Sequence, residues 1–431
     1  PLIINSGTFA VLNFCDRLFL SWYGDAEFRA SLPAGILFFT LVCGFMALAG
    51  FTNTFVAQFW GAGDRAGCAR ATAQGILFSL ISIPLIMLLT PFGLWMLNLG
   101  GHGEEVLSLE REYFSILMWC GGGMVLSSAL SSFFSGRGKT FVIMSCNIIA
   151  NGLNILLNYL FVFGKWGFPE MGISGAGWAT VIGSWTSPLI FAGLYFSRPV
   201  NAAFHTFRNL RCDPALFRRM IRFGLPAGIH WFLDVAAFTV FVMLVGRMGA
   251  VAHMASNIAL SVNLIAFMPT VGMGMAASIL VGQYLGRNEP ENAARVGWLA
   301  LKIGGVYILV VSATFLLFPS AYTRLFAGSS ASAVSAEDLF GTVRILLIML
   351  AVWGMADAAA LIISGALKGA GDTHFVMYFQ SIVAWGFLVL GQLLIVLVFR
   401  GGIYVSWGWT LLYILLLGSG FILRFRSGRW K

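Results

Sequence analysis

Long, nearly unbroken runs of apolar residues dominate this sequence, with short polar segments between them. A run of about 20 apolar residues is what an α-helix needs to cross a bilayer. Lipid offers no hydrogen bonds to the backbone, so a chain crosses it only as helices or as a closed barrel. A transmembrane barrel would show short segments of alternating polarity instead. The runs therefore predict an all-α, polytopic membrane protein.

The composition excludes the other broad classes of protein. Hydrophobic residues make up 59% of the chain and charged residues only 10%, whereas about 25% is usual for charged residues in a soluble domain. A soluble fold of 431 residues cannot bury that much apolar side chain. A disordered chain would be poor in apolar residues, and the 51 glycines show no collagen-like period of three.

Glycine, proline and charged residues divide the apolar runs into twelve predicted transmembrane helices. The predicted spans cover residues 1–22, 33–59, 73–99, 112–134, 140–164, 173–197, 220–246, 252–284, 296–318, 343–367, 374–399 and 403–423. The first span starts at Pro1 without an initiator Met or a basic segment. We therefore expect that residues precede it, and no signal peptide can be assigned.

The positive charges indicate how the chain is threaded through the membrane. The net charge is +9. The even-numbered gaps between spans and the C-terminal tail hold 17 Lys and Arg residues, against seven in the odd-numbered gaps. By the positive-inside rule, both termini and the 198–222 loop face the cytoplasm. The charge thus predicts the lipid bilayer as partner, and no nucleic acid.

An internal repeat divides the predicted spans into two halves of six. With a shift of 225 residues, positions 56–61 match 281–286, and with a shift of 233, positions 136–140 match 369–373. Six is even, so both halves start on the same side and the repeats are parallel. Two such lobes favour a substrate path between them that opens by alternating access. Because one chain contains both lobes, we expect it to act as a monomer. The predicted domains are an N-terminal lobe (1–197), a cytoplasmic linker (198–219) and a C-terminal lobe (220–431).

Three acidic residues lie inside predicted spans: Asp16, Asp234 and Asp357. An acid at that depth costs about 2.5–3.5 kcal/mol on insertion scales, so it is a functional candidate. Such a carboxyl holds a proton or pairs with a cation such as Na⁺. All three are therefore predicted cation-coupling sites, and Asp234 and Asp357 could bind Na⁺. The alternative is a structural hydrogen bond between helices.

Other polar side chains accompany these acids at helical spacing. His230 precedes Asp234 by four residues, so the two share a helix face; the pair either relays a proton or forms a simple hydrogen bond. Asn154 and Asn158 share a face of the fifth span, at the expected depth of Asp16. Asn257, in the eighth span, could face the second acidic site. Each Asn could coordinate a cation or bond another helix.

Motifs for other chemistry are absent from the sequence. It contains no P-loop, no GxSxG and no HExxH, so we expect neither an enzyme nor a bound cofactor. None of the six cysteines forms a CxxC pair, which argues against a disulfide framework or a metal cluster. The run Gly121–Gly123 lies within the fourth span, where it favours close helix packing.

Four stretches resemble the multidrug and toxic compound extrusion (MATE) family of transporters, and most of all its NorM branch. GFPEMGISGAGWAT at 167–180 is similar to the signature between spans 5 and 6, and ADAAALIISGALKGAGDT at 356–373 to that of span 10. FWGAGD at 59–64 and GLPAG at 224–228 also fit. The resemblance covers essentially the chain up to Thr373, and is looser beyond it.

The resemblance implies a twelve-helix, two-lobed exporter in the bacterial inner membrane. It would exchange small cationic, amphipathic drugs for inward Na⁺ or H⁺. Four residues match the polar positions of the family: Asp16, Asn154, Asp234 and Asp357. Asn158 stands where many members carry Asp, and Ser256-Asn257 where many have His-Gln; Trp353 lies one turn from Asp357. These departures leave the choice of coupling ion open.

Two other functions remain alternatives at this point. Similar two-lobed folds serve as flippases of lipid-linked saccharides, but these need basic residues to hold phosphates, whereas the ionisable residues in these spans are mainly acidic. A membrane scaffold that transports nothing has little reason to keep costly acids in the bilayer.

Overall fold

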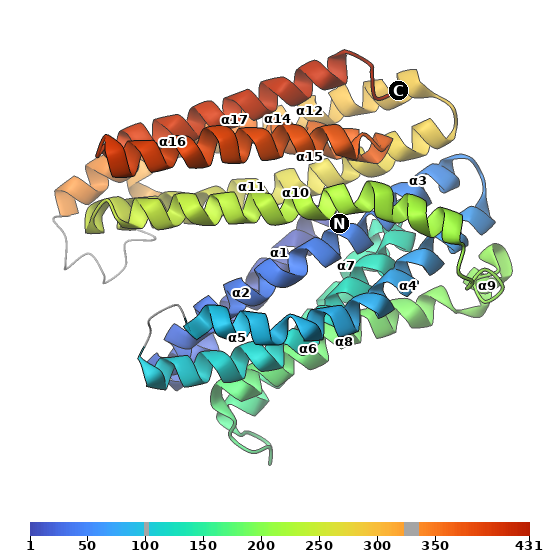
Figure 1. The fold of residues 1–431 in the computed structure, drawn as a ribbon, viewed down its shortest axis with the longest axis horizontal. Coiled ribbons are helices and arrows are strands. Elements are labelled where there is room, and N and C mark those ends of the chain that lie inside the picture. Colours follow the sequence, from blue (N-terminus) through green and yellow to red (C-terminus); the bar gives the residue numbers. More distant parts are fainter. Residues whose placement is uncertain (99–102, 323–335) are drawn as a thin grey trace. The chain divides into compact units, whose positions relative to one another are not determined.

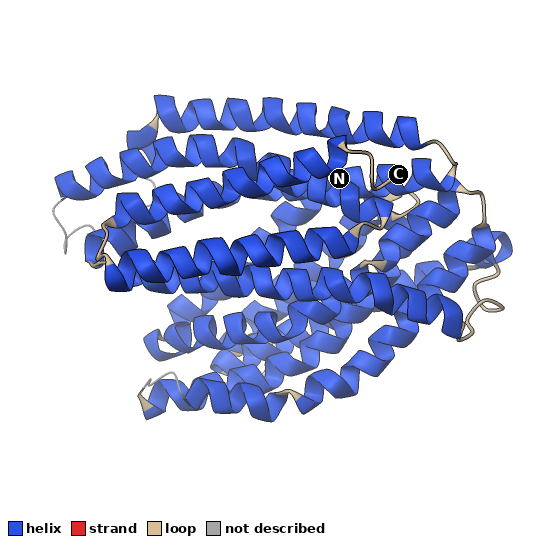
Figure 2. Ribbon diagram, turned by 45° about the horizontal axis from the view of Figure 1, so that its top comes forward, coloured by secondary structure: helices blue, strands red, loops and turns tan. Residues whose placement is uncertain are grey.

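The computed structural model describes residues 1–98, 103–322 and 336–431, and within these ranges every regular element is a helix (Figure 2). Two compact units divide the chain. One contains residues 1–232 and 286–288, and the other contains 233–285 and 289–431. The boundary falls inside a single long helix, so that helix contributes to both units.

The first unit consists of the helices drawn from blue to green in Figure 1. Its elements are α1 (Leu2–Tyr23), α2 (Asp25–Gly50), α3 (Thr52–Gly61), α4 (Arg65–Leu88), α5 (Thr90–Asn98), α6 (Glu104–Ser135), α7 (Thr140–Phe163), α8 (Gly172–Tyr195), α9 (Arg198–Phe204) and the first half of α10 (Pro214–Gly246). The side chain of Asp64 caps α4 by accepting a hydrogen bond from the Gly67 amide at 2.7 Å.

The second unit holds the rest of α10 and the helices that follow it. These are α11 (Ala250–Gly286), α12 (Pro290–Leu317), α14 (Ala336–Ala370), α15 (Thr373–Ser381), η2 (Ile382–Val389), α16 (Leu390–Leu393), η3 (Leu394–Val398) and α17 (Ile403–Arg426). The elements from α15 to η3 form one continuous apolar span, residues 373–398, in which η2 and η3 are π-helical.

The predicted all-α membrane architecture is confirmed. Ten described helices are long and apolar enough to cross a membrane, or eleven with the bent pair α8 and α9. With α1, which has 22 residues, the described elements match the predicted spans in order. Several helices run past the predicted limits; α6 begins at Glu104 rather than 112, because acidic residues suit its first turn.

Small residues bring the helices close together, as predicted for Gly121–Gly123. A Cβ on Gly123 would lie 2.8 Å from the Ser184 carbonyl oxygen of α8, so only glycine fits there. In the second unit, a Cβ on Gly274 of α11 would meet the Leu361 carbonyl of α14 at 2.9 Å. These backbone contacts fix α6 against α8 and α11 against α14.

The segment between α9 and α10 is anchored on the first unit. The buried Gln74 side chain donates a hydrogen bond to the Arg211 carbonyl (2.8 Å) and accepts one from the Asp213 amide (3.2 Å). The Arg137 guanidinium packs over the ring of Phe204, with its central carbon 4.7 Å from the ring centre. Burial lowers the pKa of Arg137 to about 10. Helix α10 begins at Pro214, within the predicted linker 198–219. The predicted boundaries of the two lobes stay a prediction.

Candidate functional site

Asp16 is held by a neighbouring helix of the first unit. It lies on α1 eight residues before Gly24, which ends the helix, or about 12 Å along the axis. The Asn158 side chain on α7 donates a hydrogen bond to Asp16 Oδ1 at 2.5 Å. The sequence predicted a common depth for these two residues, and the structure brings them into contact.

Two amide oxygens of α7, one of them in this pair, are buried without a hydrogen-bond partner among the described residues. They are Oδ1 of Asn154 and Oδ1 of Asn158, whose side chains are 2% and 0% exposed. Asn154 donates to the Ala179 carbonyl of α8 at 3.2 Å, and Gly183 lets α8 approach it closely. Buried polar atoms normally have partners. Two amide oxygens near a carboxylate suit a hard cation, which prefers oxygen ligands.

The two acids of the second unit belong to one cluster. Asp234 lies on α10, and its Oδ1 accepts a hydrogen bond from Gln380 of α15 at 2.7 Å. Asp357 on α14 interacts electrostatically with Asp234. The Tyr413 hydroxyl of α17 interacts with both carboxylates. Four helices therefore place polar groups around the two acids.

Three members of this cluster were missed by the sequence interpretation: Gln380, Tyr413 and Lys368. Gln380 is a lone amide in an apolar span, which is a usable signal, whereas a tyrosine among many aromatic residues is not. Lys368 directly follows the predicted span 343–367, in a gap that the charge pattern assigns to the cytoplasm. In the structure α14 continues to Ala370, and Lys368 is half-buried and interacts electrostatically with Asp234.

The remaining candidates lie apart or contribute packing. His230 is buried on α10, one turn before Asp234. Asn257 lies on the exposed side of α11 and bonds His253 at 3.3 Å, and no described contact joins it to Asp234 or Asp357. Its neighbour Ser256 faces inward instead, where it accepts a hydrogen bond from Trp407 at 2.9 Å.

Trp353 is also buried, one turn from Asp357, with its ring centre 5.7 Å from that of Trp407. Two large rings thus pack beside the acidic cluster and keep this side of α14 apolar. Such packing separates the carboxylates from bulk water, which strengthens their electrostatic interactions.

Comparison with known proteins gives consistent matches along both units. The family model MatE matches residues 1–160 and 226–397. The "Probable multidrug resistance protein NorM" of Rhizobium meliloti is 28% identical over 410 residues, which cover 93% of this chain and 86% of that protein. The protein of the same name from Bradyrhizobium diazoefficiens is 30% identical over 365 residues, with 84% and 77% coverage.

Among solved structures, a MOP superfamily transporter from Pyrococcus furiosus has the same fold. It superposes with a TM-score of 0.89 at 20% identity and covers 99% of this chain and 93% of its own. The likeness extends over both units. It agrees with the all-helical membrane architecture that the sequence predicted.

Proposed function

This chain belongs to the MatE family of membrane proteins. From this membership we propose that the chain is a secondary antiporter for drugs. It exports small cationic, amphipathic compounds in exchange for Na⁺ or H⁺, by alternating access. Its relatives are multidrug transporters rather than enzymes. It acts as a monomer in the bacterial inner membrane, with both termini in the cytoplasm.

Carboxylates within membrane-spanning helices are the observation that supports this function most directly. Asp16 in the first unit, and Asp234 with Asp357 in the second, each lie in an apolar helix among polar partners. A charged carboxylate there attracts a cationic drug or a coupling cation. Bound Na⁺ or H⁺ neutralises it, which lowers the cost of enclosing the site. The coupling step is then the replacement of a bound cationic drug at the carboxylate by the coupling ion, Na⁺ or H⁺.

The two acidic sites differ in their polar groups. In the first unit, Asp16 is a single carboxyl with the amide groups of Asn154 and Asn158 beside it. In the second unit, Asp234 interacts electrostatically with both Asp357 and Lys368, and the two carboxylates outnumber the one ammonium. We propose cation coupling at Asp234 and Asp357, with Na⁺ as one candidate ion, and also at Asp16, with Asn154 and Asn158 in a supporting role.

Transport into proteoliposomes with separately imposed gradients tests the proposal. We expect a Na⁺ or a pH gradient, but not both equally, to drive movement of a fluorescent monocationic dye. Replacing Asp234 or Asp357 by Asn should reduce transport about tenfold or more, since a buried charged partner contributes about 1.5–3 kcal/mol. Glu105→Gln, at the exposed start of α6, is the matched control.

Two outcomes would contradict the assignment. If both Asp→Asn variants transported the dye normally, the coupling site would lie elsewhere. Transport that persists without either gradient would exclude antiport itself. A flippase of lipid-linked saccharides is disfavoured because Lys368, the basic residue of the acidic cluster, interacts with Asp234 and is outnumbered by acids.

A further inference from the structure

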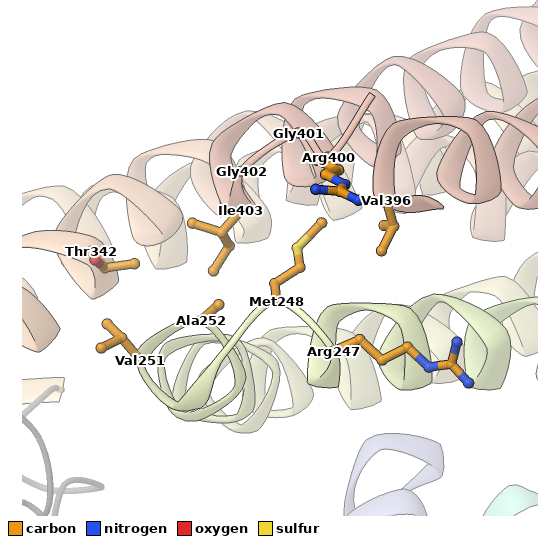
Figure 3. A pocket seen from close by; sticks show the side chains of 10 residues that line it. All are labelled: Arg247, Met248, Val251, Ala252, Thr342, Val396, Arg400, Gly401, Gly402 and Ile403. Atoms are coloured by element: carbon orange, nitrogen blue, oxygen red, sulfur yellow. The ribbon is translucent and has the colours of Figure 1, made fainter. Parts of the chain in front are cut away.

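A cavity of about 430 Å³ lies at one end of the second unit, away from the acidic cluster. The turn between α10 and α11 forms one wall, and the turn between η3 and α17 forms the other (Figure 3). All of its lining residues belong to the second unit. The cavity is therefore a property of this unit alone.

The lining combines apolar side chains with two arginines and no carboxylate. Met248, Val251, Val396 and Ile403 provide apolar surface, and Arg247 and Arg400 provide the charge. In Figure 3 the Arg400 guanidinium lies over the cavity beside Val396 and Met248, whereas the Arg247 side chain extends away from it along α10. Both arginines are exposed, and neither has an ion pair or side-chain hydrogen bond with any described residue. Two uncompensated positive charges therefore border one apolar hollow.

The backbone at Arg400 is held in a costly conformation. Its φ of 47° lies in the left-handed region, where the Cβ of a non-glycine residue comes too close to the following carbonyl oxygen. Hydrogen bonds on both sides fix it there, from the Phe399 amide to the Leu394 carbonyl (2.9 Å) and from the Gly401 amide to the Ile395 carbonyl (2.8 Å). Glycine is the usual residue at such a helix end, and here two glycines follow immediately. The arginine thus occupies a position that favours glycine and directs its side chain to the cavity.

The surroundings of the cavity suit a lipid. Val398, Phe399 and Val405 beside it are 64%, 74% and 56% exposed, as expected for side chains that face acyl chains. The cavity lies where membrane-spanning helices end, and the ends of such helices meet the polar headgroup region of a bilayer. Positive charge is also unexpected on this side, because both arginines fall in loops that the sequence places outside the cytoplasm.

We propose that this cavity binds the phosphodiester of a phospholipid headgroup. Arg400 holds the phosphate oxygens through its planar guanidinium, which matches their geometry in a bidentate manner. Arg247 has no competing partner and turns toward the same phosphate as a second donor. The start of an acyl chain packs against Met248 and Val396, and the rest joins the lipid that covers Val398 and Phe399.

Native mass spectrometry of the purified full chain with dioleoyl phosphatidylglycerol tests this site. We expect the wild type to retain the lipid. Arg400→Gln should weaken binding about fivefold, since each interfacial basic residue contributes about that factor, and Arg247→Gln should weaken it less. The double variant should lose the bound lipid. Arg344→Gln is the matched control, because Arg344 is an exposed arginine of α14 outside the cavity and should not change binding.

Further arms separate the lipid from other ligands and from misfolding. Diolein, which lacks a phosphate, should not bind, and millimolar inorganic phosphate should not displace the lipid; if either did, the proposal would fail. Retention of the lipid by the double variant would equally overturn it. Arg400→Gly relieves the left-handed backbone, so it should keep or raise the melting temperature and still lose lipid affinity.

Discussion

At the scale of single residues, two glutamines on one span illustrate how an amide serves either function or structure. Gln380 bonds one carboxylate, that of Asp234, at 2.7 Å. Gln392, three turns later, is fully buried and bonds three groups of α17: Ser406 O (2.8 Å), Thr410 Oγ1 (2.8 Å) and Ser406 Oγ (2.6 Å). The first amide stabilises a candidate coupling site, and the second stabilises helix packing.

This contrast gives a paired prediction. Gln380→Ala removes the donor to a carboxylate, so cation-driven transport should fall about tenfold, because hydrogen bonds to charged groups contribute about 1.5–3 kcal/mol. Gln392→Ala should instead lower the melting temperature, with the ion dependence of transport unchanged. Dye transport in proteoliposomes and thermal unfolding in detergent are the two measurements. If Gln380→Ala shifted only the melting temperature, Gln380 would have a structural role.

At the scale of elements, the segment between α9 and α10 is anchored rather than loose. Gln74 bonds it at Arg211 and Asp213, and Phe204 fixes its other end against Arg137. Gln74→Ala leaves a backbone carbonyl and an amide without these partners, at a cost of about 1–3 kcal/mol. We expect faster trypsin cleavage at the exposed Arg208 and Arg211 in this variant.

The control for this prediction is Ser108→Ala, which removes only an exposed hydrogen bond within α6. Its cleavage rate should equal that of the wild type. Equal rates for Gln74→Ala and the wild type would show that the Gln74 hydrogen bonds do not hold the segment in place.

At the scale of the whole molecule, one thiol reports the orientation in the membrane. Cys212 is exposed in the segment between α9 and α10, whereas Cys15 is half-buried within α1 and Cys43, Cys68, Cys120 and Cys146 are buried. If this segment faces the cytoplasm, a membrane-impermeant maleimide should label Cys212 in inside-out vesicles but not in intact cells. Cys212→Ser should abolish the labelling. Labelling in intact cells would reverse the proposed topology.

The sequence predicts the large-scale fold well, because lipid imposes one rule on every span: an apolar length with internally satisfied backbone. It also finds Asp16, Asp234 and Asp357, since a charge is conspicuous in an apolar run. It does not find Tyr413, because a neutral aromatic residue is common in such runs. It also does not assign Lys368 to the same helix as Asp357, because the following Gly-Ala-Gly resembles a turn, whereas the helix continues to Ala370.

The π-helical turns of η2 determine which way the side chains on either side of them point around the helix axis. Each wide turn takes up an additional residue relative to an α-helix, and one residue rotates everything beyond it by about 100°. Residues 382–389 lie between Gln380 and Gln392, so these turns set the angle between the two amides. Loss of one residue from η2 would rotate Gln392 away from α17 or Gln380 away from Asp234. This span therefore accepts exchanges among its exposed apolar side chains more readily than any change in its number of residues.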